Sequence, residues 1–254
     1  MDRQALAEQL VRDVSVYVAE QFRAGIGHER KDDGTVVTAA DREAERRIRD
    51  GIRSAFPDDA IVGEEHENEH GTSGITWYID PIDGTSNFAT GIPFFGISLA
   101  YADSEGPLGC AIALPIFGSV YVAERGKGAR KDGKAITVRQ DAGEGRTPLF
   151  WLTYINRDDP RAAALYALVP RPRLRIVGST VVALALYAEG AAHGIITFDQ
   201  KPWDYAAGLL LAKEAGAAIT GIFDSETSLP DVASFIATAP QHVDALKELV
   251  TKIS

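Results

Sequence analysis

Apolar residues return at every fourth position near the start of the chain, within a run that is otherwise polar. This first run comprises Leu6, Leu10, Val14, Val18 and Phe22, and Gly25 follows it. Such spacing places one apolar stripe along a helix, which the glycine then ends. A second stripe predicts another helix, with Thr38 as its N-cap and Pro57 as its stop; it consists of Ala44, Ile48, Ile52 and Phe56.

Short runs rich in β-branched and aromatic residues come next and predict strands over 60–62, 75–79, 96–101, 110–114 and 120–123. Asp132-Gly133 fits a hairpin turn. Later, strands (150–154, 174–177, 194–198, 218–223) alternate with helices (161–168, 178–189, 205–215, 242–253). This alternation predicts an α+β fold of layered sheets with helices between and outside them. A polar stretch at 141–147 predicts a junction between an N-terminal half, 1–140, and a C-terminal half, 141–254.

Composition narrows the class of protein. The chain has 254 residues, 45% of them hydrophobic, and a net charge of −10, the opposite sign to that of a protein that binds nucleic acid through its bulk charge. The one cysteine, Cys110, has no partner for an internal disulfide. No apolar run approaches the ~18 residues of a membrane span, and no apolar segment follows Met1 as in a secretory signal. We therefore expect a cytoplasmic protein that binds neither nucleic acid nor membrane.

The stretch Asp80-Pro81-Ile82-Asp83-Gly84-Thr85 begins where a predicted buried strand ends. Ligands of layered α/β proteins usually bind at such strand ends. Pro81 fixes the φ angle between the two carboxylates, and Gly84 permits a backbone conformation that other residues resist. If a helix begins here, the amides of residues 84–86 form an anion site. Hard oxygens beside an anion site suit a divalent cation that bridges to phosphate.

Two aspartates three positions apart can also make a turn and cap a helix, which is the simpler interpretation of the pair taken alone. Further acids change the balance. Glu64-Glu65 also follows a short strand, and Asp204 directly precedes an apolar helix. Clustered carboxylates repel one another and are hard to keep ionised without a cation. We therefore expect a metal site to which three separate segments contribute.

These segments resemble the signature motifs of the inositol monophosphatase family. The resemblance rests on Gly63-Glu64-Glu65, then Trp77-x-x-Asp80-Pro81-Ile82-Asp83-Gly84-Thr85-x-Asn87-Phe88, then Trp203-Asp204-x-Ala206-Ala207-Gly208, in that order and with that spacing. Lys31 to Asp41 is similar to the family's upstream segment, and Gly178-Ser179 stands where the family has a substrate loop. The resemblance covers nearly the whole chain.

The resemblance implies a Mg²⁺-dependent phosphatase with a layered α-β-α-β-α sandwich. Glu64, Asp80 and the Ile82 carbonyl would hold one ion. Asp80, Asp83 and Asp204 would hold a second, and a third, weaker ion would lie near Glu64. The nucleophile would be a metal-bound water. The resemblance also implies which residues bind the substrate: Asp83, Gly84, Thr85, Gly178, Ser179 and Thr180.

Glu64, Thr85 and Asp41 are the catalytic residues that the resemblance implies, with Thr85 and Asp41 as a proton-relay pair for that water. Asp41 also has a structural interpretation, since Thr38-x-x-Asp41 fits a capping box. The residues alone leave the two interpretations open. The match to the family's Val-Thr-x-x-Asp pattern favours the catalytic one.

The substrate is less well determined than the chemistry. Family members that act on inositol phosphates commonly have an acid seven residues before the Trp-Asp aspartate, where this chain has Thr197, with Asp199 two residues later. The segment 90–96 and the Lys201-Pro202 step are similar to relatives that hydrolyse histidinol phosphate. We expect myo-inositol 1-phosphate as the substrate, with histidinol phosphate and a 3′-phosphoadenosine nucleotide as alternatives. A metal-binding scaffold without catalysis is the alternative from another class. Because relatives are often homodimers, we expect a homodimer.

Overall fold

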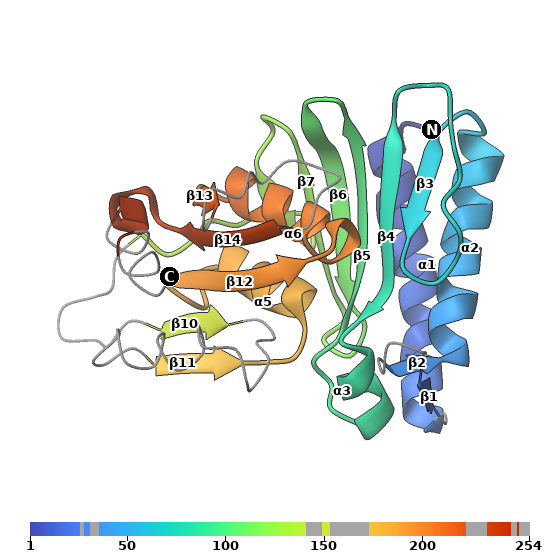
Figure 1. Cartoon of the computed structure of the whole chain (residues 1–254), viewed down its shortest axis with the longest axis horizontal. Helices are drawn as coiled ribbons and strands as arrows, with labels where there is room; N and C mark the ends of the chain where they lie inside the picture. Colours follow the sequence, from blue (N-terminus) through green and yellow to red (C-terminus); the bar gives the residue numbers. More distant parts are fainter. Residues whose placement is uncertain are drawn as a thin grey trace.

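Helices and sheets alternate in four layers in the computed structural model, which describes residues 1–25, 28–30, 36–140, 149–152, 173–221, 233–244 and 248. Helices α1 (Arg3–Ala24) and α2 (Ala39–Ala55) cover one face of a seven-stranded sheet (Figure 1). Helices α5 (Thr180–Ala188) and α6 (Pro202–Glu214) lie between the other face of that sheet and a five-stranded sheet. None of the described helices has enough apolar length to span a bilayer.

The seven-stranded sheet keeps its strands in chain order, β3 to β9. Only β3 and β4 run parallel, and every other neighbouring pair is antiparallel. The predicted hairpin at Asp132-Gly133 is confirmed, because these residues connect β8 to β9 with φ angles of 47° and 78°. The strands are β3 (Ala60–Gly63), β4 (Thr76–Asp83), β5 (Gly96–Asp103), β6 (Gly106–Leu114), β7 (Ser119–Glu124), β8 (Ala129–Lys131) and β9 (Lys134–Ala135).

The five-stranded sheet has the order β11-β10-β12-β14-β13. Strand β10 pairs in parallel with β11 and β12, and β14 pairs antiparallel with β12 and β13. The strands are β10 (Leu149–Leu152), β11 (Arg173–Ile176), β12 (Gly194–Gln200), β13 (Ala218–Gly221) and β14 (Ala233–Thr238). The two sheets thus take their strands from the two predicted halves, although the division at residue 140 itself stays a prediction.

Four small elements complete the described chain. Strands β1 (His28–Arg30) and β2 (Val36–Thr38) form an antiparallel pair that the sequence pattern did not predict. Helix α3 (Thr85–Thr90) follows β4, and the 3₁₀ helix η1 is Pro240–His242. The helix predicted over 161–168, the junction at 141–147 and most of the helix predicted over 242–253 lie outside the described residues.

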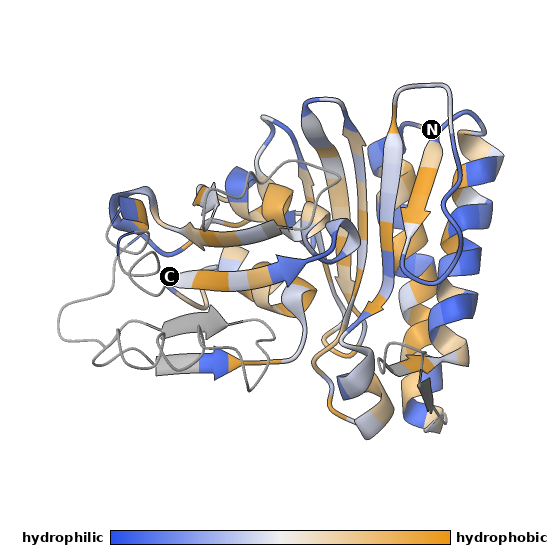
Figure 2. Ribbon diagram, in the orientation of Figure 1, coloured by the Kyte–Doolittle hydropathy of each residue, from blue (hydrophilic) through white to orange (hydrophobic). Residues whose placement is uncertain are grey.

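The predicted apolar stripe of α1 packs against the seven-stranded sheet. Leu6, Leu10, Val14 and Val18 are buried, and the hydropathy colouring shows the polar residues of α1 and α2 on the outer side (Figure 2). The Asp2 carboxylate caps α1 by accepting a hydrogen bond from the Ala5 amide at 2.7 Å. At the other end Gly25 adopts φ 71°, the left-handed conformation in which glycine commonly ends a helix.

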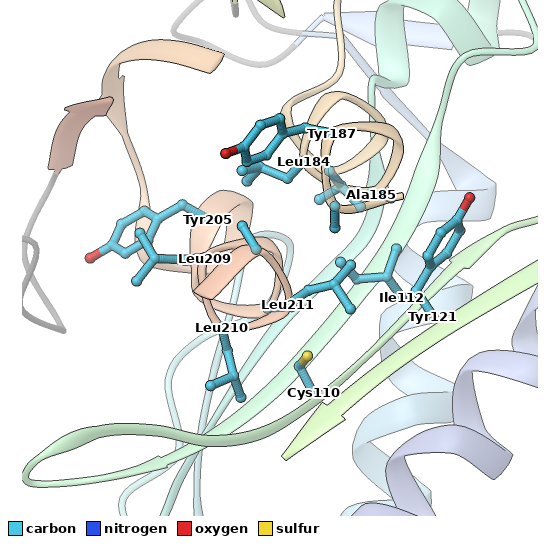
Figure 3. Packing of buried hydrophobic residues seen from close by; sticks show 14 of the residues in the cluster. Cys110, Ile112, Tyr121, Leu184, Ala185, Tyr187, Tyr205, Leu209, Leu210 and Leu211 are labelled. Atoms are coloured by element: carbon cyan, nitrogen blue, oxygen red, sulfur yellow. The ribbon is translucent and has the colours of Figure 1, made fainter. Parts of the chain in front are cut away.

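Helices α5 and α6 are apolar on nearly all sides because sheets cover them on both faces. Figure 3 shows Leu211 of α6 beside Ile112 of β6, with Leu184 and Ala185 of α5 in the same cluster. Gly208 allows the two helices to approach closely, since a Cβ atom there would lie 2.4 Å from Leu184 Cδ1. This packing places the N-termini of both helices at the end of β4, where the candidate site lies.

Asp59 joins the start of β3 to α1 and β4. Its buried carboxylate accepts two hydrogen bonds from Arg3, both 2.8 Å, one from Ser73 Oγ at 2.6 Å and one from Trp77 Nε1 at 2.8 Å. Burial raises the pKa of Asp59, but the hydrogen bonds from Arg3, Ser73 and Trp77 outweigh it, and the pKa lies below its ordinary value.

We expect Asp59→Asn to lower the free energy of unfolding by about 2 kcal/mol at pH 7, because the amide nitrogen faces donors where an oxygen accepted them. A carboxyl with a lowered pKa in the folded state stabilises the protein above its unfolded pKa and loses that effect as the pH falls. The difference between the proteins should therefore shrink below about pH 4. Urea unfolding at pH 7 and below about pH 4 measures this difference in the free energy of unfolding.

The exposed Asp50, which pairs with Arg46, supplies the control. We expect Asp50→Asn to change the free energy of unfolding by less than about 0.5 kcal/mol. Equal stability of wild type and Asp59→Asn at pH 7 would contradict the stabilising role of the Asp59 carboxylate.

Candidate active site

A pocket with a volume of about 220 Å³ opens where β4 ends and α5 and α6 begin. Ten of the residues that line it are site residues predicted from the sequence. The eleventh, Gln200, was not predicted. The lining residues are Glu64, Asp80, Ile82, Asp83, Gly84, Thr85, Gly178, Ser179, Thr180, Gln200 and Asp204.

Strand β4 carries Asp80 and Asp83 into this pocket. Its pairing with β5 is regular up to Asp80 opposite Ser98, then shifts before Asp83 opposite Gly96. Irregularities of this kind bend a strand and re-aim its side chains. The Ile82 amide donates a hydrogen bond to Asp80 Oδ1 at 3.0 Å, which fixes that carboxylate against the backbone of the bend.

Carboxylates from distant parts of the chain meet here. One oxygen each from Asp80, Asp83 and Asp204 lie within 4.8 Å of one another. Asp204 lies in the first turn of α6, where its Oδ2 accepts a hydrogen bond from the Lys201 amide at 3.0 Å. Glu64 lines the same pocket because it follows β3, the parallel neighbour of β4, and parallel strands end at the same edge.

Burial and mutual repulsion disfavour the ionised forms of these acids. Both effects raise the pKa of Asp80 well above its ordinary value, with Glu64, Asp83 and Asp204 as the repelling charges. Burial raises the pKa of Asp83 to about 7 in spite of the hydrogen bond from Ser179. Burial is the main cause that raises the pKa of Asp204 to about 8, and repulsion from Asp83 is the second.

The donor set suits a divalent cation that prefers oxygen ligands. Carboxylate oxygens converge from β4 and α6, and Glu64 and Ile82 line the same pocket. Among the described residues that line the pocket there is no Lys or Arg to balance the negative charge. A bound cation would supply that balance and lower the pKa values of the acids.

Gly84 brings the end of β4 against the predicted substrate loop. Its φ is 93°, and a Cβ atom here would lie 2.9 Å from the Phe94 carbonyl oxygen and 3.1 Å from Ser179 Cβ. Both the conformation and the close approach therefore require glycine. Helix α3 begins directly after it, so the predicted anion site at residues 84–86 lies at the start of this six-residue helix.

Ser179 joins the predicted substrate loop to Asp83. Its hydroxyl donates to Asp83 Oδ2 at 2.5 Å, and the Val181 amide donates to the same oxygen at 2.6 Å. Ser179 Oγ also accepts from the Val182 amide at 3.1 Å and caps α5. Asp83 therefore lies at the N-terminus of α5, where the helix dipole favours a negative charge.

The capping and relay interpretations of Asp41 fit the same geometry. Asp41 Oδ2 accepts hydrogen bonds from the Thr38 amide at 2.9 Å and the Thr38 hydroxyl at 2.5 Å, and this capping box begins α2. Asp41 Oδ1 lies 3.0 Å from Thr85 Oγ1, which is also 3.0 Å from the Ile82 carbonyl oxygen. Burial raises the pKa of Asp41, opposed by the hydrogen bonds from Thr38 and Thr85. Asp41 does not line the pocket and reaches it through Thr85.

Gln200 is the residue of β12 that lines the pocket. Its Oε1 accepts a hydrogen bond from Thr180 Oγ1 at 2.5 Å, and its Nε2 donates to the Phe198 carbonyl at 2.6 Å. Thr197 is fully buried, and Asp199, with φ 53°, is exposed and lies against Ser234. Neither Thr197 nor Asp199 lines the pocket. No motif marks Gln200, and only its place at the end of β12 could have indicated it.

We expect Mg²⁺ to stabilise the folded protein more at about pH 9 than at about pH 6. Acids with raised pKa values bind more protons in the folded than in the unfolded state, so ion-free stability falls as the pH rises through those values. Protons also compete with a cation for the carboxylates. Scanning calorimetry with EDTA or with millimolar Mg²⁺ tests both statements. A Mg²⁺-induced rise in Tm that is equal at the two pH values, or absent at both, would contradict this electrostatic account of the site.

Comparison with known proteins agrees with the resemblance seen in the sequence. A model of the inositol monophosphatase family matches residues 2–254. The chain is 38% identical over 201 residues to a "Fructose-1,6-bisphosphatase/inositol-1-monophosphatase" of Thermotoga maritima, covering 76% of this chain and 74% of that protein. It is 35% identical over 193 residues to a "Histidinol-phosphatase" of Chlorobaculum parvum, with 73% and 72% covered.

Solved structures show the same architecture. The structure of an IMPase from Thermotoga maritima matches with a TM-score of 0.89 at 31% identity, and the match covers 100% of this chain and 98% of that one. The layered α+β sandwich predicted from the sequence is thereby confirmed.

Proposed function

The chain belongs to the inositol monophosphatase family, and on that premise we propose that it is a Mg²⁺-dependent phosphatase that hydrolyses the phosphate monoester of a small polyol. Myo-inositol 1-phosphate is the first candidate substrate. The observation that supports this most directly is the convergence of Asp80, Asp83 and Asp204 at the end of β4. The expected homodimer and the cytoplasmic location stay predictions.

Two groups of oxygens in the pocket would hold the ions. Glu64, Asp80 and the Ile82 carbonyl form one group, and Asp83 and Asp204 share Asp80 in the second. A third ion would lie near Glu64. When bound, Mg²⁺ would neutralise the phosphate oxygens and lower the pKa of a coordinated water.

Thr85 and Asp41 would remove the proton from the attacking water. The proton would pass to Thr85 Oγ1 while the hydroxyl proton moves to Asp41 Oδ1, 3.0 Å away. Burial gives Asp41 a raised pKa, and this makes its carboxylate a better proton acceptor than an exposed one. The Thr38 amide and hydroxyl hold the other oxygen of Asp41, so the accepting oxygen keeps its direction toward Thr85.

The remaining lining residues would contact the substrate. The backbone at Gly84 and Thr85 would receive the phosphate, and the segment Gly178 to Thr180 with Gln200 would face the leaving group. The hydroxyl and amide groups of Thr180 and Gln200 suit the hydroxyls of a neutral polyol.

Histidinol phosphate is the second candidate substrate. The relative from Chlorobaculum parvum carries the name histidinol-phosphatase. The described lining is rich in carboxylates, and its negative potential would attract the ammonium group of that substrate. A 3′-phosphoadenosine nucleotide is the third candidate, because the described lining has no aromatic or basic side chain to bind its base or second phosphate.

Phosphate release from these three substrates, with and without millimolar Mg²⁺, tests the proposal. We expect Mg²⁺-dependent turnover, with kcat/KM ranking the substrates. If none of the three substrates is hydrolysed, the phosphatase assignment for these substrates is wrong. If the rate of hydrolysis does not depend on Mg²⁺, the proposed metal site is wrong.

We expect Asp83→Asn to lower kcat at least about 100-fold, because the variant loses a charge that would hold a cation against the phosphate. Steady-state kinetics on the best substrate measures the effect. Asp103→Asn is the matched control: Asp103 ends β5 on the same sheet and pairs with Arg125, far from the pocket lining, so it should keep kcat. A near-normal kcat of Asp83→Asn would show that the Asp83 carboxylate is not required for catalysis.

A further inference from the structure

The loop after β3 is folded around a buried ion pair of helix α2. Glu45 and Arg49 have side chains only 0% and 1% exposed, and Arg49 Nε lies 2.7 Å from Glu45 Oε1. Neither residue lines the pocket or belongs to the motifs that define the site. Buried charges are unfavourable unless hydrogen bonds satisfy them, so the partners of this pair show what it holds in place.

Glu45 binds the amide groups of the loop. Its Oε2 accepts a hydrogen bond from the Glu65 amide at 2.8 Å, and its Oε1 accepts a longer one from the His66 amide at 3.3 Å. The carboxylate also lies directly against Gly63, where a Cβ atom would come within 2.3 Å of Glu45 Oε1. Glu64 therefore stands between Gly63, which packs against this carboxylate, and Glu65, whose amide binds it.

Arg49 binds the carbonyl groups of the same loop. Its Nη1 donates to the Glu67 carbonyl at 3.1 Å, and its Nη2 donates to the His66 carbonyl at 3.3 Å. Nη1 also lies 2.6 Å from Glu69 Oε1. One ion pair thus satisfies both donors and acceptors of the loop that carries Glu64.

We propose that Glu45 and Arg49 are positioning residues that fix the Glu64 carboxylate in the pocket and so set the affinity for the cation. This rests on the proposed function, in which Glu64 is a ligand. The pair projects from a helix of 17 residues, so it holds the loop at a fixed distance from α2. Without this pair the loop backbone would be less constrained, and the Glu64 carboxylate would be held less firmly toward Asp80.

Glu45→Gln tests the role of the carboxylate at nearly constant shape. Both oxygens of Glu45 accept hydrogen bonds, and whichever way a glutamine is oriented, its amide nitrogen meets a donor from Arg49 or Glu65. With Mn²⁺ as the probe, calorimetry on the full chain should show binding weakened about tenfold or more. Hydrogen exchange of the 63–69 backbone amides should become faster in the absence of metal.

Gly63→Ala perturbs the same contact from the other side, because its Cβ would displace the Glu45 carboxylate. It decides the question if Glu45→Gln does not fold. Gly51→Ala is the matched control: this glycine of α2 also lacks room, but its Cβ would meet Leu10 Cδ2, the flexible end of a side chain, at 2.4 Å. We expect Gly51→Ala to keep the Mn²⁺ affinity and the loop exchange of wild type.

Phosphate release gives a third measurement. Glu45→Gln should need a higher Mg²⁺ concentration for half-maximal rate while kcat at saturating Mg²⁺ recovers most of the wild-type value. A purely structural pair would lower stability and leave the Mg²⁺ requirement unchanged.

The outcomes separate the two proposals. If wild type does not bind Mn²⁺, the proposed function and this inference both fall. If wild type binds it, and both Glu45→Gln and Gly63→Ala bind it with the wild-type affinity, the inference alone is wrong. Weakened binding in either folded variant, with unchanged binding in Gly51→Ala, supports it.

Discussion

The repulsion between buried carboxylates at the end of β4 is the constraint around which the site is built. Three aspartates present oxygens within 4.8 Å of one another, where burial raises the pKa values of all three. One oxygen of each is oriented by a nearby donor: the Ile82 amide for Asp80, the Ser179 hydroxyl and Val181 amide for Asp83, and the Lys201 amide for Asp204. The acids are thus held together in spite of their charge, an arrangement that a divalent cation satisfies.

The layered architecture supplies part of the compensation. Helices α5 and α6 lie between the two sheets, and their N-termini meet the end of β4. Asp83 accepts hydrogen bonds from the first turn of α5, and Asp204 lies in the first turn of α6. The positive ends of two helix dipoles therefore face the acids. Close packing of the helices at Gly208 and Leu184 maintains this geometry, so the core between the sheets and the charge of the site are parts of one arrangement.

The parts of the site that could be predicted from the sequence are those whose geometry is set within a few consecutive residues. Asp80 to Thr85 could be assigned from the sequence because a strand end, a proline and a glycine fix their relative directions within six residues. The layers followed from apolar periodicity. Gln200 could not be predicted as a lining residue, since its place in the pocket depends on α5 lying beside the end of β12. The β1–β2 pair was missed because three-residue strands carry too little pattern.

Helix α2 shows a further limit of periodicity and its physical reason. Asp41, Glu45 and Arg49 recur every fourth residue, a pattern that in a sequence is typical of solvent-exposed ion pairs. All three are buried, beside the apolar stripe of Ala44, Ile48 and Ile52. Their partners come from distant segments, Asp41 binding Thr85 and the Glu45–Arg49 pair binding the loop of Glu64.

Exposed charges of α2 also pair within the helix, as Arg46 does with Glu43 and Asp50. One helix thus carries two kinds of polar face that the sequence does not distinguish. Its buried polar face contacts two walls of the pocket, the wall that holds Thr85 and the wall that holds Glu64. Because Asp41 and Glu45 lie one turn apart on a single rigid helix, the proposed proton acceptor, Asp41, and the loop that carries the proposed metal ligand, Glu64, cannot move independently. The relative position of these two walls is therefore a property of α2, an element that lines no part of the pocket itself.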